Sequence, residues 1–253
     1  MAQYVYAVAS VTKRFDTAPG FTWYRGCANN AHRLVPGAYR HSIDEESVTE
    51  DFLISLPVHA GNRAFDPWEI YSLMQHHGVP TRLLDWSKSP LAALFFALDF
   101  QEATYPRGAN PVVWVLNPFS LNQLVHGKPA VMVPRVGYGP PDMADLVSSY
   151  LPDALRPTAS FASGTRIEGP VAVEPTFTNA RLIAQAGCFT VHGTADSPLE
   201  ELVGLSDDLF VIEIDRTATQ NLRGQLEQLG YRGDVIYPDL DHLAKRIVSD
   251  YSA

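Results

Sequence analysis

The chain contains few cysteines and no long apolar run. Cys27 and Cys188 are its only two thiols, too few for a disulfide framework, and no CxxC pair indicates zinc. No apolar run approaches the ~20 residues needed to cross a bilayer, so we expect no membrane partner. The first ten residues lack the basic leader of a signal peptide, and we therefore expect reduced thiols and a cytoplasmic location.

Basic residues are also scarce. The sequence has 19 Lys and Arg against 28 Asp and Glu, which gives a formal net charge of −9. Proteins that hold phosphate backbones with their whole surface are usually basic. Any contact with nucleic acid is therefore expected in a local cleft and not across the whole surface.

Several common catalytic motifs are missing. The sequence has no G-x-S-x-G, Walker A, H-E-x-x-H or G-x-G-x-x-G pattern, which disfavours serine hydrolases of that type, P-loop enzymes and Rossmann dehydrogenases. His76 and His77 are adjacent, and two neighbours on a helix cannot face the same way. With no third ligand at a diagnostic spacing, we expect no metal.

Hydrophobic patterns predict one α+β domain over residues 1–253, with a helical N-terminal half and a central mixed or antiparallel sheet. Residues 118–165 are rich in Pro, Gly and Ser and predict an insertion or a lid. The predicted strands are 21–26, 111–116, 171–173, 180–184, 188–192, 209–214 and 235–237. The predicted helices are 42–56, 66–77, 87–100, 216–229 and 239–251.

Arg25 ends the first predicted strand, between Tyr24 and Gly26. An arginine there offers a rigid fork of donors for phosphate or carboxylate. Gly26 would let a ligand approach the backbone closely. On this triplet alone, an exposed arginine paired with one of the many acids is the simpler interpretation.

Residues 75–87 are the densest polar segment and run from a helix end through an extended piece to a helix start. Ligand-binding groups often collect at such ends. Asp85 could fix Arg82 or a histidine, and Ser87 could cap the next helix. A buried network that ties helix to sheet is an almost equally good interpretation.

Polar side chains also lie on the two strands predicted around residues 186–187. Strand alternation would place Arg181 and Ile183 on one face, with Gln185 at the turn and His192 on the second strand. An exposed polar sheet edge is the alternative interpretation, and for His192 it is the preferred one.

Taken together, these residues resemble the FRG domain family. Tyr24-Arg25-Gly26 is similar to the Phe-Arg-Gly triplet that names the family. The segment from Gln75 to Ser87, followed by residues 89–97, resembles its longest signature. Residues 179–190 and 237–244 are similar to its third and last blocks. The resemblance covers residues 21–246, nearly the whole chain.

The order of elements also resembles that of ADP-ribosyltransferases, whose sheet is split. This resemblance implies NAD as a co-substrate, with Arg25 on its phosphate and His77 or Trp86 beside the nicotinamide. No acid lies at 181–185, where that family has its glutamate, so Glu174 or Glu168 would substitute. The implied cofactor-binding residues are Tyr24, Arg25, Gly26, His76, Thr81, Arg82, Asp85, Trp86 and Ser87. The implied catalytic residues are Arg25, His77, Glu174, Arg181 and Gln185.

Two functions follow as expectations. The first is transfer of ADP-ribose from NAD to a macromolecule, nucleic acid or protein, as in a bacterial toxin or phage-defence effector. An antitoxin or regulatory protein would then be a natural partner. The second is a non-catalytic module that binds a nucleotide, RNA or protein through the same cleft. The order of elements favours the first, and the missing glutamate favours the second.

Overall fold

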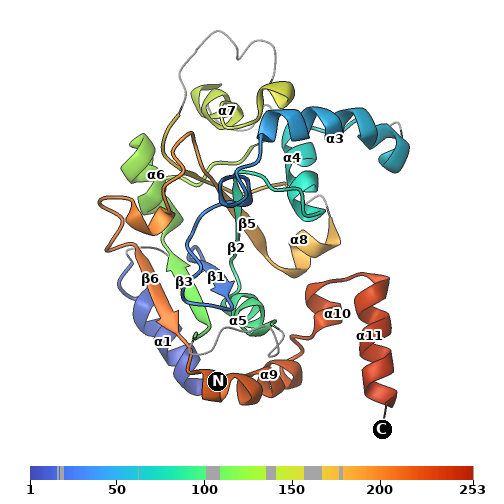
Figure 1. The fold of residues 1–253 in the computed structure, drawn as a ribbon. Coiled ribbons are helices and arrows are strands. Elements are labelled where there is room, and N and C mark those ends of the chain that lie inside the picture. Colours follow the sequence, from blue (N-terminus) through green and yellow to red (C-terminus); the bar gives the residue numbers. More distant parts are fainter. Residues whose placement is uncertain are drawn as a thin grey trace.

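Six strands form one antiparallel sheet at the centre of the computed structural model (Figure 1). The structure describes residues 1–252 except 16, 18–19, 62, 101–108, 135–140, 157–166 and 177–178. The strands lie in the order β4-β5-β2-β1-β3-β6, which confirms the predicted α+β class. They are β1 (Trp23–Cys27), β2 (Leu83–Ser87), β3 (Val112–Leu116), β4 (Val171–Val173), β5 (Gly187–Val191) and β6 (Leu209–Glu213).

Local signals start several of the helices. Asp66 accepts a hydrogen bond from the Trp68 N–H at 2.9 Å at the start of α4, and Asp239 caps α11 in the same way. The helices are α1 (Ala2–Thr12), α2 (Gly37–Arg40), α3 (Glu45–Ala60), α4 (Pro67–His76), α5 (Pro90–Leu98), α6 (Pro118–His126), α7 (Pro141–Ser148), α8 (Ala180–Ala184), α9 (Thr219–Gln228), α10 (Gly233–Ile236) and α11 (Leu240–Tyr251). Among the described residues, no helix is long and apolar enough to cross a membrane.

The sheet opens between its two central strands. β1 and β2 share the single registered pair Tyr24–Ser87, whereas the β1–β3 ladder runs from Trp23–Leu116 to Cys27–Val112. The β2–β5 ladder is equally continuous. The sheet is therefore split into two halves, β6-β3-β1 and β2-β5-β4, that diverge from one point of contact.

Each half has its own core on one face of the sheet. Helices α1, α5 and α9 cover β1 and β3, and their buried side chains include Tyr4, Tyr24, Leu94, Val113 and Leu226. Helix α4 and residues 147–155 cover the other half, with Tyr71, Met74, Leu83, Val173 and Val191 buried. A third core lies on the opposite face of the sheet and includes Trp23, Leu34, Trp86, Leu116 and Cys188. The opening between β1 and β2 falls between the first two cores.

The described part of residues 118–165 packs into these cores. Leu121, Met132 and Tyr150 are almost completely buried, and Met132 forms an isolated bridge with Val173 of β4. This part of the predicted insertion or lid is therefore integral to the fold. The remainder of the segment, 135–140 and 157–165, lies outside the described residues.

Two predicted strands are wrong. Residues 180–184 form helix α8, because Asn179 accepts a hydrogen bond from the Leu182 N–H at 2.8 Å and starts a helical turn. Arg181 and Ile183 therefore do not share a strand face. Val235–Tyr237 is also not a strand, since Val235 and Ile236 belong to the short helix α10. Apolar runs this short are compatible with either structure until tertiary contacts decide.

Candidate functional site

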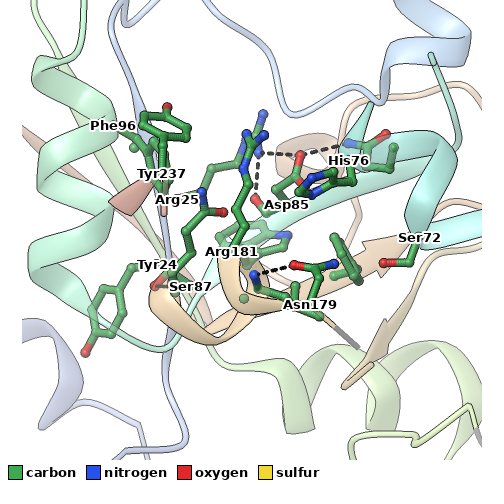
Figure 2. Close-up of a pocket in the computed structure, with 17 residues that line it drawn as sticks. Tyr24, Arg25, Ser72, His76, Asp85, Ser87, Phe96, Asn179, Arg181 and Tyr237 are labelled. Carbon is green, nitrogen blue, oxygen red and sulfur yellow. Dashed lines mark hydrogen bonds and ion pairs between the residues drawn. The ribbon is translucent and has the colours of Figure 1, made fainter. Parts of the chain in front are cut away.

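A cavity of about 290 Å³ lies where the sheet opens (Figure 2). Its wall is built from β1, β2, β5, α4, α5, α8 and the residue that follows α10. It brings together many of the predicted site residues, namely Tyr24, Arg25, Gly26, His76, Asp85, Trp86, Ser87, Arg181 and Gln185. We call this cavity the central pocket. The predicted residues His77, Thr81, Arg82 and Glu174 are not in its wall.

Arg25 crosses the opening between the two half-sheets. Its Nη1 donates a hydrogen bond to the Asp85 backbone carbonyl at 2.6 Å and lies 3.9 Å from Asp85 Oδ2. Its Nε is buried and has no hydrogen-bond partner among the described residues. The guanidinium is thus held by β2 while part of its donor capacity remains unused, as an anion-binding arginine requires.

Asp85 is held from the other side by a chain of hydrogen bonds. Gln75 Nε2 donates to Asp85 Oδ2 at 2.8 Å, and Thr81 Oγ1 donates to Gln75 Oε1 at 2.7 Å. The Leu83 N–H donates in turn to Thr81 Oγ1 at 3.1 Å. Thr81 is therefore a buried positioning residue and does not line the pocket. Gln75, which was not predicted as a site residue, forms part of the wall.

Arg181 supplies the second guanidinium of the central pocket. It lies over the ring of Tyr237, with 4.9 Å between Cζ and the ring centroid. Burial and the nearby Arg181 charge both lower the pKa of His76, which lines the same pocket. Figure 2 shows Arg25 and Arg181 directed toward the same space. Asp85 is the only carboxylate among the lining residues, so the two guanidiniums give this pocket an excess of positive charge.

Aromatic rings form another part of the wall. Phe96 of α5 and Tyr237 contact each other with 6.1 Å between ring centroids, and both line the pocket. Neither was predicted as a site residue. The sequence placed Tyr237 at the end of a predicted strand, although it lies in a block that resembles the FRG family. Tyr237 follows α10, and its ring contacts Phe95 and Phe96 of α5 and lies under Arg181.

Only one of the two adjacent histidines faces the pocket. The rings of His76 and His77 are 4.8 Å apart and nearly perpendicular. His76 lines the central pocket, while His77 lines a separate groove between α3 and α4 with Phe52 and Leu73. The expectation that His77 lies beside a nicotinamide is therefore not met by its position.

Arg82 belongs to a buried network and not to the pocket. Its Nε lies 2.5 Å from Glu45 Oε2, and its Nη2 donates to the Tyr150 carbonyl at 2.5 Å. Its Nη1 donates to the carbonyl of His192, whose side chain is itself buried. The proposed Asp85–Arg82 contact is wrong, since Glu45 is the partner. No spacing pattern in the sequence links Arg82 to Glu45, because the two residues lie far apart along the chain.

The two candidate substitutes for a catalytic glutamate lie elsewhere. Glu174 forms an ion pair with Lys88, and Glu168 is exposed outside the pocket wall. Among the described residues, no group of three His, Cys, Asp or Glu side chains is placed to hold a metal ion. Any chemistry that needs a carboxylate in the central pocket would therefore depend on Asp85.

Gly26 packs against helix α5. A Cβ at this position would overlap the Ala93 carbonyl oxygen and crowd the Ala97 nitrogen. The glycine is therefore required for close approach of α5 to β1, and its missing side chain does not face a ligand. This corrects the interpretation in which Gly26 admits a ligand to the backbone.

Ser87 and Gln185 hold the wall together. Ser87 Oγ donates to the Gln185 carbonyl at 2.6 Å and accepts from the Ser89 N–H at 2.9 Å. Gln185 Nε2 donates to the Ile236 carbonyl at 3.1 Å. Ser89, not Ser87, caps α5. These bonds fix β2, α8 and α10 around the central pocket.

The comparison with protein families agrees with the resemblance seen in the sequence. Residues 21–105 match the model of the FRG domain. The match includes Arg25 and the whole segment 75–87, but it ends before Arg181 and Tyr237. No curated protein and no solved structure matches the chain.

Proposed function

We propose that this chain, whose residues 21–105 are an FRG domain, binds NAD in the central pocket and transfers its ADP-ribose to a macromolecule. The observation that supports this most is the convergence of Arg25 and Arg181 with aromatic rings and one carboxylate at the opening of the sheet. The chemistry of each part matches a part of the dinucleotide.

The two arginines suit the diphosphate. A guanidinium offers several donors in a planar fork and stays charged at all relevant pH values. Hydrogen bonds between charged groups are about twice as strong as those between neutral ones. Arg25 lines the central pocket, and its bond to the Asp85 carbonyl fixes the guanidinium there. Arg181 approaches from the opposite wall on α8.

The aromatic part of the wall suits a planar ring of NAD, and Asp85 suits the ribose that reacts. Phe96 offers an apolar ring for a planar heterocycle, while the Tyr237 ring supports the Arg181 guanidinium. In the transfer, the bond between ribose C1′ and the nicotinamide nitrogen breaks, and its electron pair leaves with neutral nicotinamide. C1′ bonds to the acceptor nucleophile, which releases a proton. The positive charge that develops on the ribose would be stabilised by the Asp85 carboxylate.

A second candidate is a non-catalytic nucleotide-binding module. One observation favours it: Asp85 is already engaged by Gln75 and by Arg25, and no glutamate is found among the described residues that line the central pocket. A carboxylate held in this way could serve only to orient Arg25. The pocket would then bind its ligand without turnover.

NAD binding and nicotinamide release distinguish these functions. We expect the parent protein to bind NAD in calorimetry, and we expect Arg25→Lys and Arg181→Ala to weaken binding by about tenfold or more. Lys13→Ala is the matched control, because Lys13 is an exposed cation at the end of α1. Binding with release of nicotinamide supports the transferase, and binding without release supports the module. A folded parent protein that does not bind NAD would overturn the proposal.

A further inference from the structure

A second cavity of about 200 Å³ lies against the other side of the Arg25–Asp85 contact. It shares Arg25, Gln75 and Asp85 with the central pocket. The rest of its wall comes from α2 and the residue that follows it, from residues 78–80 after α4, and from the start of β2. We call it the outer cavity. A ligand in the outer cavity and a ligand in the central pocket would both contact Asp85, whose side chain is 57% exposed.

The outer cavity is basic. Arg40 and His41 contribute to its wall from the C-terminal end of α2, and both are exposed. Burial and the charges of Arg40 and Arg25 lower the pKa of nearby His32, which favours its neutral form, so the positive charge of the cavity comes from the arginines. Asp85 is the only acid among the described residues of the wall. This local excess of positive charge contrasts with the net charge of −9 of the whole chain.

Arg40 has no structural role that would explain its position. Unlike Arg82, which is buried and paired with Glu45, Arg40 forms no ion pair with another residue that the structure describes. An exposed guanidinium on the rim of a basic cavity is suited to a phosphate that arrives from solvent.

We propose that the outer cavity is the acceptor site and binds a phosphate of a single nucleic-acid strand. This inference rests on the proposed function and specifies its substrate class. A cavity of about 200 Å³ between a helix end and a strand has no room for a duplex, whereas one backbone phosphate fits on Arg40. The adjoining nucleotide would then lie across Asp85 from the ribose of the bound NAD.

The short basic surface also accounts for how an acidic protein could bind nucleic acid. Affinity for a strand depends on the phosphates that are neutralised, not on the net charge of the whole protein. Contact through Arg40 and His41 involves few phosphates, so binding is expected to be weak and its salt dependence shallow.

The test measures strand binding and NAD binding on the same proteins. Fluorescence anisotropy of a labelled single-stranded oligonucleotide of mixed sequence, as RNA and as DNA, is followed at several salt concentrations. We expect Arg40→Ala to weaken oligonucleotide binding about tenfold and to reduce the salt slope by about 0.7. Its affinity for NAD should equal that of the parent, and Lys13→Ala should change neither.

The possible outcomes separate the two proposals. A folded protein that binds NAD but not the oligonucleotide overturns the acceptor site and leaves the proposed function intact. Equal loss of NAD affinity in Arg40→Ala and Arg25→Lys also overturns it, because the outer cavity would then belong to the nucleotide. Oligonucleotide binding through Arg40 without NAD binding retains the strand site and refutes its role as an acceptor site.

Discussion

Arg82 and Glu45 form an ion pair inside the protein, with 2.5 Å between Nε and Oε2 and only 11% and 9% of the two side chains exposed. The Tyr71 hydroxyl donates to the same carboxylate at 2.5 Å. Removing either partner leaves an uncompensated buried charge. We expect Arg82→Ala and Glu45→Ala each to lower the free energy of unfolding by about 3–5 kcal/mol in urea titrations.

The matched control for this pair is Arg33→Ala. Arg33 bonds to Glu200 and Glu201, but its side chain is half exposed. Exposed ion pairs contribute little, so the urea midpoint should hardly change. If Arg82→Ala proved as stable as Arg33→Ala, the network around Glu45 would not be a structural one.

Gly26→Ala should destabilise the protein severely. The added methyl group would overlap the Ala93 carbonyl oxygen in the backbone of α5, and a helix backbone cannot yield as a side chain can. We expect a loss of about 3 kcal/mol or more in the free energy of unfolding. Thermal and urea unfolding both measure this loss.

Gly224→Ala provides the opposite control. Gly224 lies within α9, and a Cβ there would contact nothing within 4 Å. Alanine is favoured over glycine in a helix, so this variant should gain about 0.5–1 kcal/mol. If Gly26→Ala left the free energy of unfolding unchanged, α5 would be able to move away from β1. Close packing would then no longer account for the glycine of the triplet.

Elements with local signals were predictable from the sequence. Asp66 and Pro67 begin α4, and Gly78, with φ of +83°, follows its end. These features act over one helical turn and do not depend on the rest of the fold. The strand that carries Arg25 follows in the same way from a short aromatic run, although Arg25 lies in the middle of β1 and not at its end as predicted. Its place in a pocket depends on more distant contacts.

The remaining site residues depend on tertiary contacts. Arg82 was assigned to the site, but Glu45, 37 positions away, holds it in the interior. Arg181 was placed on a strand, and its actual position comes from a helix of five residues capped by Asn179. Nothing in the sequence around Tyr237 indicated more than a structural role for this residue. Residue pairs that meet only when the half-sheets assemble leave no periodic pattern in the sequence.

His192 should make stability fall between pH 6.5 and about 4. Its ring is buried, and neither ring nitrogen has a hydrogen-bond partner among the described residues. Burial and the nearby Arg82 charge lower its pKa from 6.5 to about 4. In that window the unfolded chain binds a proton that the folded protein does not, so stability rises with pH and is lost as pH falls. This one group accounts for roughly 3 kcal/mol when the window has been crossed.

Urea midpoints at pH 7 and pH 4.5 test this. The variant His192→Phe keeps a ring of similar size and cannot be protonated, so its stability should depend less on pH than that of the parent. Part of the dependence of stability on pH will remain in this variant, because burial also lowers the pKa values of His76 and His126. An unchanged slope in His192→Phe would show that this ring can be protonated in the folded protein.

Tyr237 should act on the ligand through Arg181. Its ring lies beneath the guanidinium at 4.9 Å and also stacks on His242. Tyr237→Phe keeps the ring and should keep NAD affinity, whereas Tyr237→Leu removes the face that supports Arg181. We expect the second variant to bind NAD several-fold more weakly, since a cation–π contact contributes about 0.5–2 kcal/mol. Equal weakening in both would instead assign the effect to the hydroxyl.

Asp85→Asn separates binding from chemistry in the central pocket. The substitution keeps the size of the side chain and removes the charge proposed to stabilise the ribose cation. NAD affinity should change little, because Arg25 and Arg181 remain, while nicotinamide release should fall about a hundredfold or more. Gln75→Leu should give a smaller fall, because it removes the 2.8 Å hydrogen bond that orients Asp85 but leaves the charge in place. Unchanged release in Asp85→Asn would exclude Asp85 from the reaction. Asp85 is the one carboxylate among the described residues of the wall, so unchanged release would also leave this part of the site without a group that stabilises the ribose cation by its charge.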